Sequence, residues 1–278
     1  ALYEFDGVVR NLSRAGAVAG VLAGLFGIGG GLVIVPVLIF SFSLQGVSAD
    51  VAAHLAIGTS LATIVFTSVS SIRSHHLHGS VRWELFRPMM VGIVVGAVLG
   101  AYTAALIPGE MLTVIIGVFV ILVAIKMLLD VKPSASRQVP GKSGLVVAGG
   151  GIGWASAIFG IGGGTLTVPF LSWCNVKMQQ AVGTSAACGL PIALAGALAN
   201  IGTGWGNTGL PEYSLGYVYL PAMLGIVLTS VIFARVGAVL AHKLDALMLK
   251  RIFAILLIIV GIRFWSDGVG LFFFSCFA

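Results

Sequence analysis

The sequence contains very few charged side chains. Only 9% of its 278 residues are Asp, Glu, Lys or Arg, whereas hydrophobic residues make up 58%, and the mean hydropathy is +1.10. Soluble globular domains carry about 25% charged residues, so this composition excludes a soluble domain of the ordinary kind. Apolar stretches long enough to cross about 30 Å of hydrocarbon recur along the chain. The sequence therefore predicts an all-α integral membrane protein.

Cysteine is also scarce, and the positive charge is scattered. The chain has three Cys residues, isolated from one another: Cys174, Cys188 and Cys276. We therefore expect no disulfide. The formal net charge is +6, but Lys and Arg stand singly or in short groups at the ends of apolar runs. That distribution favours a role in membrane orientation over nucleic-acid binding.

Signatures of enzymes and cofactor sites are missing as well. The glycine-rich stretch at residues 27–31 resembles a dinucleotide loop, but no βαβ unit and no acidic residue at the required distance accompany it. No Ser-His-Asp set, paired carboxylates or HExxH pattern occurs. His75, His76 and His78 have no Cys, Asp or Glu beside them, so with Arg73 they indicate a cytoplasmic basic rim and not a metal site. We expect no enzyme, no cofactor and no metal.

The most informative feature that is present is an internal repeat. Phe-Gly-Ile-Gly-Gly-Gly occurs at residues 26–31 and again at 159–164, each time followed by Val-Pro, and Gly-Thr-Ser occurs at 58–60 and 183–185. Further on, Pro88 falls into step with Pro221. A polar connector with Pro and Gly separates the halves. We predict a first membrane repeat at 1–130, a connector at 131–142 and a second membrane repeat at 143–278.

Each repeat holds four apolar segments. They cover residues 12–44, 50–72, 85–107 and 110–130 in the first repeat and 143–174, 178–202, 215–241 and 247–265 in the second. Glycines recur every four residues, as at Gly92, Gly96 and Gly100, and this spacing predicts closely packed helices in lipid. Exposed faces of small residues would also suit a homodimer, although nothing in the sequence requires one.

The first segment of each repeat is too long for one straight crossing. About 32 residues would form a helix of about 48 Å, against about 30 Å of hydrocarbon. Glycines occupy its centre, and Pro36 or Pro169 follows. We predict a break or a re-entrant turn in both copies.

The basic loops help to choose a topology. If each first segment enters and leaves by the same face, three basic loops become cytoplasmic, as the positive-inside tendency requires. Three crossings per repeat then make the repeats inverted. We predict six full crossings and two re-entrant hairpins whose glycine tips meet at mid-membrane. Eight full crossings with parallel repeats are the alternative, and Arg10 and Arg14 fit the hairpin arrangement poorly because it places them outside.

The paired glycine breaks mark a candidate binding site. Irregular backbone at membrane depth needs protein or a water-filled cavity to satisfy its polar groups. Amides at the start of a half-helix carry partial positive charge and suit an anion. The glycines permit close approach of backbone to ligand, or alternatively tight packing of the tips. The candidates are Phe26, Gly27, Gly29, Gly30, Gly31, Phe159, Gly160, Gly162, Gly163 and Gly164.

Polar groups on the second segments complete this site. The candidates are Gly58, Thr59, Ser60, Gly183, Thr184 and Ser185. Lone Ser and Thr in membrane helices otherwise bond to their own carbonyls. His54 lies one turn before Gly58 and is a candidate for coupling proton movement to anion movement. Gln179 takes its place in the second repeat. Candidates for path or gating are Arg73, Asn200 and Arg235.

The doubled glycine motif, with Pro five residues after its last Gly and Gly-Thr-Ser further on, resembles the TauE/SafE family of membrane transporters. The resemblance covers about Asn11 to Trp265. It implies movement of small sulfur-containing or carboxylated anions, such as sulfite, sulfoacetate or thiosulfate, across the bacterial inner membrane. The glycine and Gly-Thr-Ser positions carry over residue by residue, but the identity of the substrate does not.

We therefore predict a secondary transporter of small sulfur-containing or organic anions. Alternating access would expose a midplane site between the two repeats to either side. A passive anion channel is the nearest alternative, and a membrane enzyme or binding protein using the same cavity is a more distant one. The expected partners are a small anion, membrane lipid and a coupling proton, and no nucleic acid.

Overall fold

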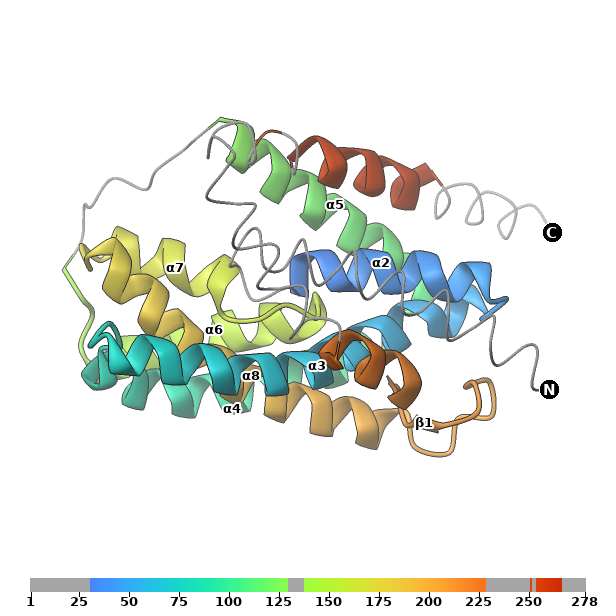
Figure 1. Cartoon of the computed structure of the whole chain (residues 1–278), viewed down its shortest axis with the longest axis horizontal. Coiled ribbons are helices and arrows are strands. Elements are labelled where there is room, and N and C mark those ends of the chain that lie inside the picture. Colours follow the sequence, from blue (N-terminus) through green and yellow to red (C-terminus); the bar gives the residue numbers. More distant parts are fainter. Residues whose placement is uncertain (1–30, 130–137, 229–250, 252–253, 267–278) are drawn as a thin grey trace.

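The computed structural model describes residues 31–129, 138–228, 251 and 254–266 as a bundle of helices (Figure 1). The labelled helices are α2 (Gly31–Leu44), α3 (Ala49–Leu77), α4 (Trp83–Ala105), α5 (Gly109–Leu128), α6 (Lys142–Ile158), α7 (Gly164–Trp173) and α8 (Met178–Thr203). Two short antiparallel strands follow, β1 (Ser214–Leu215) and β2 (Val218–Tyr219). Residues 220–228 and Ala254–Ser266 are also helical.

Four helices in this part of the chain are long and apolar enough to cross a membrane: α3, α4, α5 and α8. They match the predicted segments 50–72, 85–107, 110–130 and 178–202 to within a few residues at each end. Large apolar side chains such as Leu99, Leu122 and Leu198 are exposed on their outer faces. The chain is a multi-pass membrane protein.

The predicted break in the second repeat is confirmed. Segment 143–174 forms two helices, because α6 ends at Ile158 and α7 begins at Gly164. Gly160 has a φ of 62°, in the left-handed region that favours glycine. Pro169 lies inside α7, as Pro36 does inside α2, so the glycines and not the prolines make the interruption. In the first repeat, residues 26–30 lie outside the described part, and α2 starts at Gly31.

Close packing at the predicted glycines is confirmed for α4 and α6. A Cβ added to Gly92, Gly96 or Gly100 would collide with a carbonyl oxygen of α6, at Val146, Gly150 and Trp154 in turn. From the other side, Gly149 and Gly153 lie against the carbonyls of Met89 and Ile93. The bare backbones therefore touch along the full contact, as small-residue packing in lipid requires. This contact joins a helix of the first repeat to one of the second.

The central helices are α3 and α8, which pack against each other. In their most apolar stretch, 61% of residues are buried in each, against 44% in α4 and 28% in α5. Figure 1 shows α5 with the helix Ala254–Ser266 at one side of the bundle, where Gly117 and Gly261 face each other. Both Gly-Thr-Ser motifs therefore lie on the innermost helices.

Candidate functional site

The start of α2 touches the break of the second repeat. A Cβ on Gly31 would lie 2.9 Å from Cα of Ile161 and 3.0 Å from the carbonyl oxygen of Gly160. Ser60 of α3 donates a 2.8 Å hydrogen bond to that same carbonyl. Gly31, the last residue of the first motif, therefore lies against the break of the second repeat, and Ser60 of the central helix α3 bonds to the same carbonyl.

The N-terminus of α7 presents unpaired polar groups. Among the described residues, the backbone amides of Gly162, Gly163 and Gly164 donate to no acceptor, and Gly163 offers no side-chain cap. The hydroxyls of Ser156 and Thr167, both fully buried, also lack a partner within the part of the chain that the structure describes. An unpaired polar group in a low-dielectric interior is costly. These five polar groups therefore make the break the candidate binding site.

The glycines of this break differ in how much room they have. A Cβ on Gly163 would lie 2.5 Å from the carbonyl oxygen of Ser185 and 3.0 Å from the amide nitrogen of Gly189, so it packs tightly on α8. Gly162 is buried, yet its Cβ would meet nothing nearer than Ile64 at 3.5 Å. Tight packing accounts for Gly163, while an added methyl group at Gly162 would make only ordinary van der Waals contact with Ile64.

Thr59 of α3 binds the backbone of the second repeat. Its hydroxyl accepts a 2.9 Å hydrogen bond from the amide of Tyr219, and both residues are buried. Gly58 lies so close to the carbonyl of Tyr217 that no Cβ could fit there. The first two residues of this motif therefore hold the strand β2 just before the helix at 220–228.

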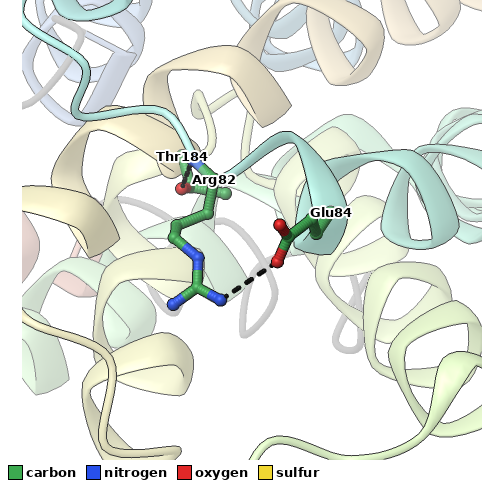
Figure 2. Close-up of polar contacts among 3 residues, drawn as sticks. All are labelled: Arg82, Glu84 and Thr184. Carbon is green, nitrogen blue, oxygen red and sulfur yellow. Dashed lines mark hydrogen bonds and ion pairs between the residues drawn. The ribbon is translucent and has the colours of Figure 1, made fainter.

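Thr184 of α8 makes the corresponding contact with the first repeat. Its hydroxyl accepts a 2.9 Å hydrogen bond from the amide of Arg82, the residue before α4 (Figure 2). A Cβ on Gly183 would lie 2.5 Å from the carbonyl oxygen of Ser80. The side chain of Arg82 points away and forms an exposed ion pair with Glu84 at 3.2 Å.

The serines of the two motifs behave differently. Ser60 reaches across to Gly160, whereas the hydroxyl of Ser185 donates to the carbonyl of Val182 in its own helix at 2.8 Å. The local bond of Ser185 is the ordinary one for a lone Ser in a membrane helix.

His54 is buried between helices, with 5% of its surface exposed. Its Nδ1 and Nε2 atoms each lie 3.0 Å from a carbonyl oxygen, of Asp50 and of Ala104. A neutral ring can donate to one of these oxygens and an imidazolium to both. The ring also stacks on Tyr217, with centroids 5.0 Å apart. Gln179, its counterpart in the repeat, is exposed.

The remaining predicted site residues do not form one group in the structure. Phe159 stacks on Phe119 with centroids 3.8 Å apart, and Gly164 is the first residue of α7. Asn200 is buried beside Gly58, 3.2 Å from its added Cβ, and Arg73 is exposed on α3. The described part of the chain contains no group of three metal-ligating side chains. Phe26, Gly27, Gly29, Gly30 and Arg235 lie outside the described residues.

Sequence reasoning missed Ser156 and Thr167, because single hydroxyls in apolar segments carry no distinctive pattern. It also missed Arg82 and Tyr219, since backbone amides leave no signal in a sequence. Only the internal repeat gave a clue, because a Gly-Thr pair that occurs in both repeats is expected to make equivalent contacts in both. A separate hollow of about 310 Å³ is lined by residues 204–207 and 210–216, none of them a predicted site residue.

Comparison with known proteins identifies the family of the chain. The family model described as sulfite exporter TauE/SafE matches residues 12–264. A "Probable membrane transporter protein" of Haemophilus influenzae is 42% identical over 252 residues, which cover 89% of this chain and 94% of the relative. Relatives of the same description from Methanocaldococcus jannaschii and Bacillus subtilis are each 27% identical, and they cover 94% and 91% of this chain and 96% of their own lengths. No solved structure matches significantly. The chain therefore belongs to the TauE/SafE family and is a membrane transporter.

Proposed function

We propose that the chain is a secondary transporter of small sulfur-containing or organic anions, with sulfite and sulfoacetate as the first candidates, in the bacterial inner membrane. The observation that carries the proposal is the break at 159–163, where, among the described residues, three backbone amides have no acceptor and two buried hydroxyls of the adjoining helices have no partner. The family description names sulfite export, and a compact oxyanion has enough acceptor oxygens for such a set of donors.

The electrostatics of the break also favour an anion. The free amides start α7, so the positive end of its peptide dipoles faces the break. Neither α6 nor α7 carries an acidic residue that would repel an anion at short range. Neutral donors replace water around the anion without a buried countercharge, and this leaves binding weak enough for release. Alternating access would then expose this site to each side of the membrane in turn.

Substitution of Gly162 by Ala tests the site. The structure has room for the added methyl group, so the fold should tolerate it, whereas an anion at the amide of Gly162 would lose its closest approach. We expect the KM for sulfite in proteoliposomes to rise by about tenfold, as for the loss of one good contact. Gly151→Ala is the matched control, because its Cβ in α6 would meet nothing within 4 Å.

Equal kinetics of the two variants would contradict the proposed site. Thr167→Val adds a second test, since it removes an unpaired hydroxyl with little change in shape. If the hydroxyl faces an empty apolar void, Val should raise stability and leave transport unchanged. If it faces the anion or its water, KM should rise.

Proton coupling is the part of the proposal that separates a secondary transporter from a passive channel. His54 is the candidate residue, because it is buried and its ring nitrogens face two carbonyls. Sulfite flux should follow an imposed proton gradient, and His54→Gln should abolish that dependence. Flux indifferent to the gradient in the unmodified protein would favour a channel.

A further inference from the structure

The two Gly-Thr steps form a crossed pair of contacts between the repeats. Thr59 of the first repeat holds the amide of Tyr219, and Thr184 of the second holds the amide of Arg82. We propose that these threonines are latches, each fastening the third segment of one repeat to the second segment of the other, so that the bodies which move during transport contain parts of both repeats. This inference rests on the proposed transport function.

The chemistry of each latch suits a permanent bond. Arg82 and Tyr219 each immediately precede a helix, where the backbone amide lacks an acceptor within the helix. Releasing such an amide into an apolar interior is costly. Gly58 and Gly183 bring the backbones close enough for the Thr hydroxyl to reach. Opening both latches in every transport cycle would expose two amides that have no other acceptor among the described residues.

Helix packing embeds α4 in the second repeat, although α3 packs on α8 as extensively as α4 does. The glycine face of α4 lies directly on α6, and α4 also packs on α8, so this helix of the first repeat is embedded in the second. The loop at 217–219 lies on α3 through Gly58, Thr59 and the stacked ring of His54. One body therefore contains α3 with residues 217–228, and the other contains α4, α6 and α8. The contact of α3 with α8 lies between them.

Several polar contacts cross between these bodies and would have to open or shift: Ser60 of α3 donates to the carbonyl of Gly160 after α6, and the amide of Tyr217 donates to the carbonyl of Asn200 in α8. Nε2 of His54 on α3 contacts the carbonyl of Ala104, near the end of α4. The chain continues from there through residues 106–108 into α5.

Two engineered disulfides distinguish mixed bodies from rigid repeats. The first joins Arg82→Cys to Thr184→Cys across a latch. The second joins Ser68→Cys to Gly189→Cys across the α3–α8 face, where the Ser68 hydroxyl lies 3.4 Å from the added Cβ of Gly189. Both pairs link the first repeat to the second. Only the second pair links the two proposed bodies.

The measurement is sulfoacetate flux in proteoliposomes before and after oxidation, in a background with Cys174, Cys188 and Cys276 replaced by Ala. Sulfoacetate is the probe because sulfite itself cleaves disulfides. We expect the latch disulfide to leave flux within about twofold and the α3–α8 disulfide to lower it by about tenfold or more, reversibly with reductant. Loss of flux in both pairs would show that the repeats move as units, and retention in both would show that the α3–α8 face does not move; either overturns the proposal.

Hydrogen exchange tests the latches without transport. Thr184→Val should raise amide exchange at residues 80–86 alone, and Thr59→Val at 217–223 alone, while Thr→Ser at either position should preserve protection. If exchange rose in the same repeat as the substituted threonine, or did not rise at all, the proposed latches would be overturned. If the reduced proteins carried neither sulfoacetate nor sulfite while the crossed pattern appeared, the proposed function would fail and the latches would stand.

Discussion

The helices α3 and α8 carry the same Gly-Thr-Ser motif and use it only partly in the same way. In both, Gly lies against a carbonyl of the other repeat and Thr accepts an amide from it. The third residue differs, since Ser60 bonds to the glycine break and Ser185 bonds within its own helix. The duplicated part of the motif therefore fastens the repeats together, and the polar groups near the proposed site differ.

The residue one turn earlier sharpens the contrast. His54 is buried and faces two carbonyls and an aromatic ring, while Gln179 is exposed. Two equivalent halves would give the inward-open and outward-open states equal energies. His54 breaks this equivalence, so in the proposed alternating-access cycle the two states would have unequal energies.

The largest expected effect comes from the motif glycines. Gly58→Ala should lower the free energy of unfolding by about 3 kcal/mol, because the added methyl group meets backbone that cannot move aside. Gly183→Ala should cost about 2 kcal/mol, since its collision with Ser80 is milder. Denaturant unfolding in detergent measures both, with Gly202→Ala as control because its Cβ would meet nothing. If the Gly58→Ala protein were as stable as the control, the close contact of the motif glycine with the other repeat would be contradicted.

These shared contacts mark the limit of what the sequence could predict. Segment limits, the break at 159–163 and the glycine face of α4 followed from length, spacing and helix propensity, all of which are local. The partners of Thr59 and Thr184 did not, because each bond joins residues more than a hundred positions apart.

The pairing of Pro88 with Pro221 shows the same limit within one segment. Pro88 is the sixth residue of α4, whereas Pro221 follows the first residue of its helix. Equal spacing of prolines in the sequence therefore does not give equal places in the two helices. Helix starts depend on tertiary contacts such as the latches.

The next largest difference in stability is expected between substitutions of His54 and of Gln179. His54→Ala removes a stacked ring and its contacts with two carbonyls, and it leaves a cavity between helices, so we expect a loss of about 2 kcal/mol. Gln179→Ala should change stability by less than about 0.5 kcal/mol, as at an ordinary exposed position. Thermal or denaturant unfolding of the two variants side by side measures the difference, and equal losses would remove the asymmetry proposed for the two halves.

The serines give the smallest effect. Ser60→Ala leaves the carbonyl of Gly160 without its donor and should cost about 1 kcal/mol, together with a rise in the KM for sulfite. Ser185→Ala removes only a bond within its own helix and should be neutral to within about 0.5 kcal/mol. Unfolding and flux measurements on both variants test this difference. If Ser185→Ala lost more stability or transport than Ser60→Ala, the assignment of Ser60 to the proposed site would be wrong.

The most direct test of the anion site is anomalous diffraction from crystals of the protein soaked in selenite, which has the charge and shape of sulfite and carries a strong anomalous scatterer. The account predicts one anomalous peak within hydrogen-bonding distance of the amides of Gly162–Gly164. A peak at the exposed basic residues instead, or none at the break at concentrations that compete with sulfite transport, would contradict it.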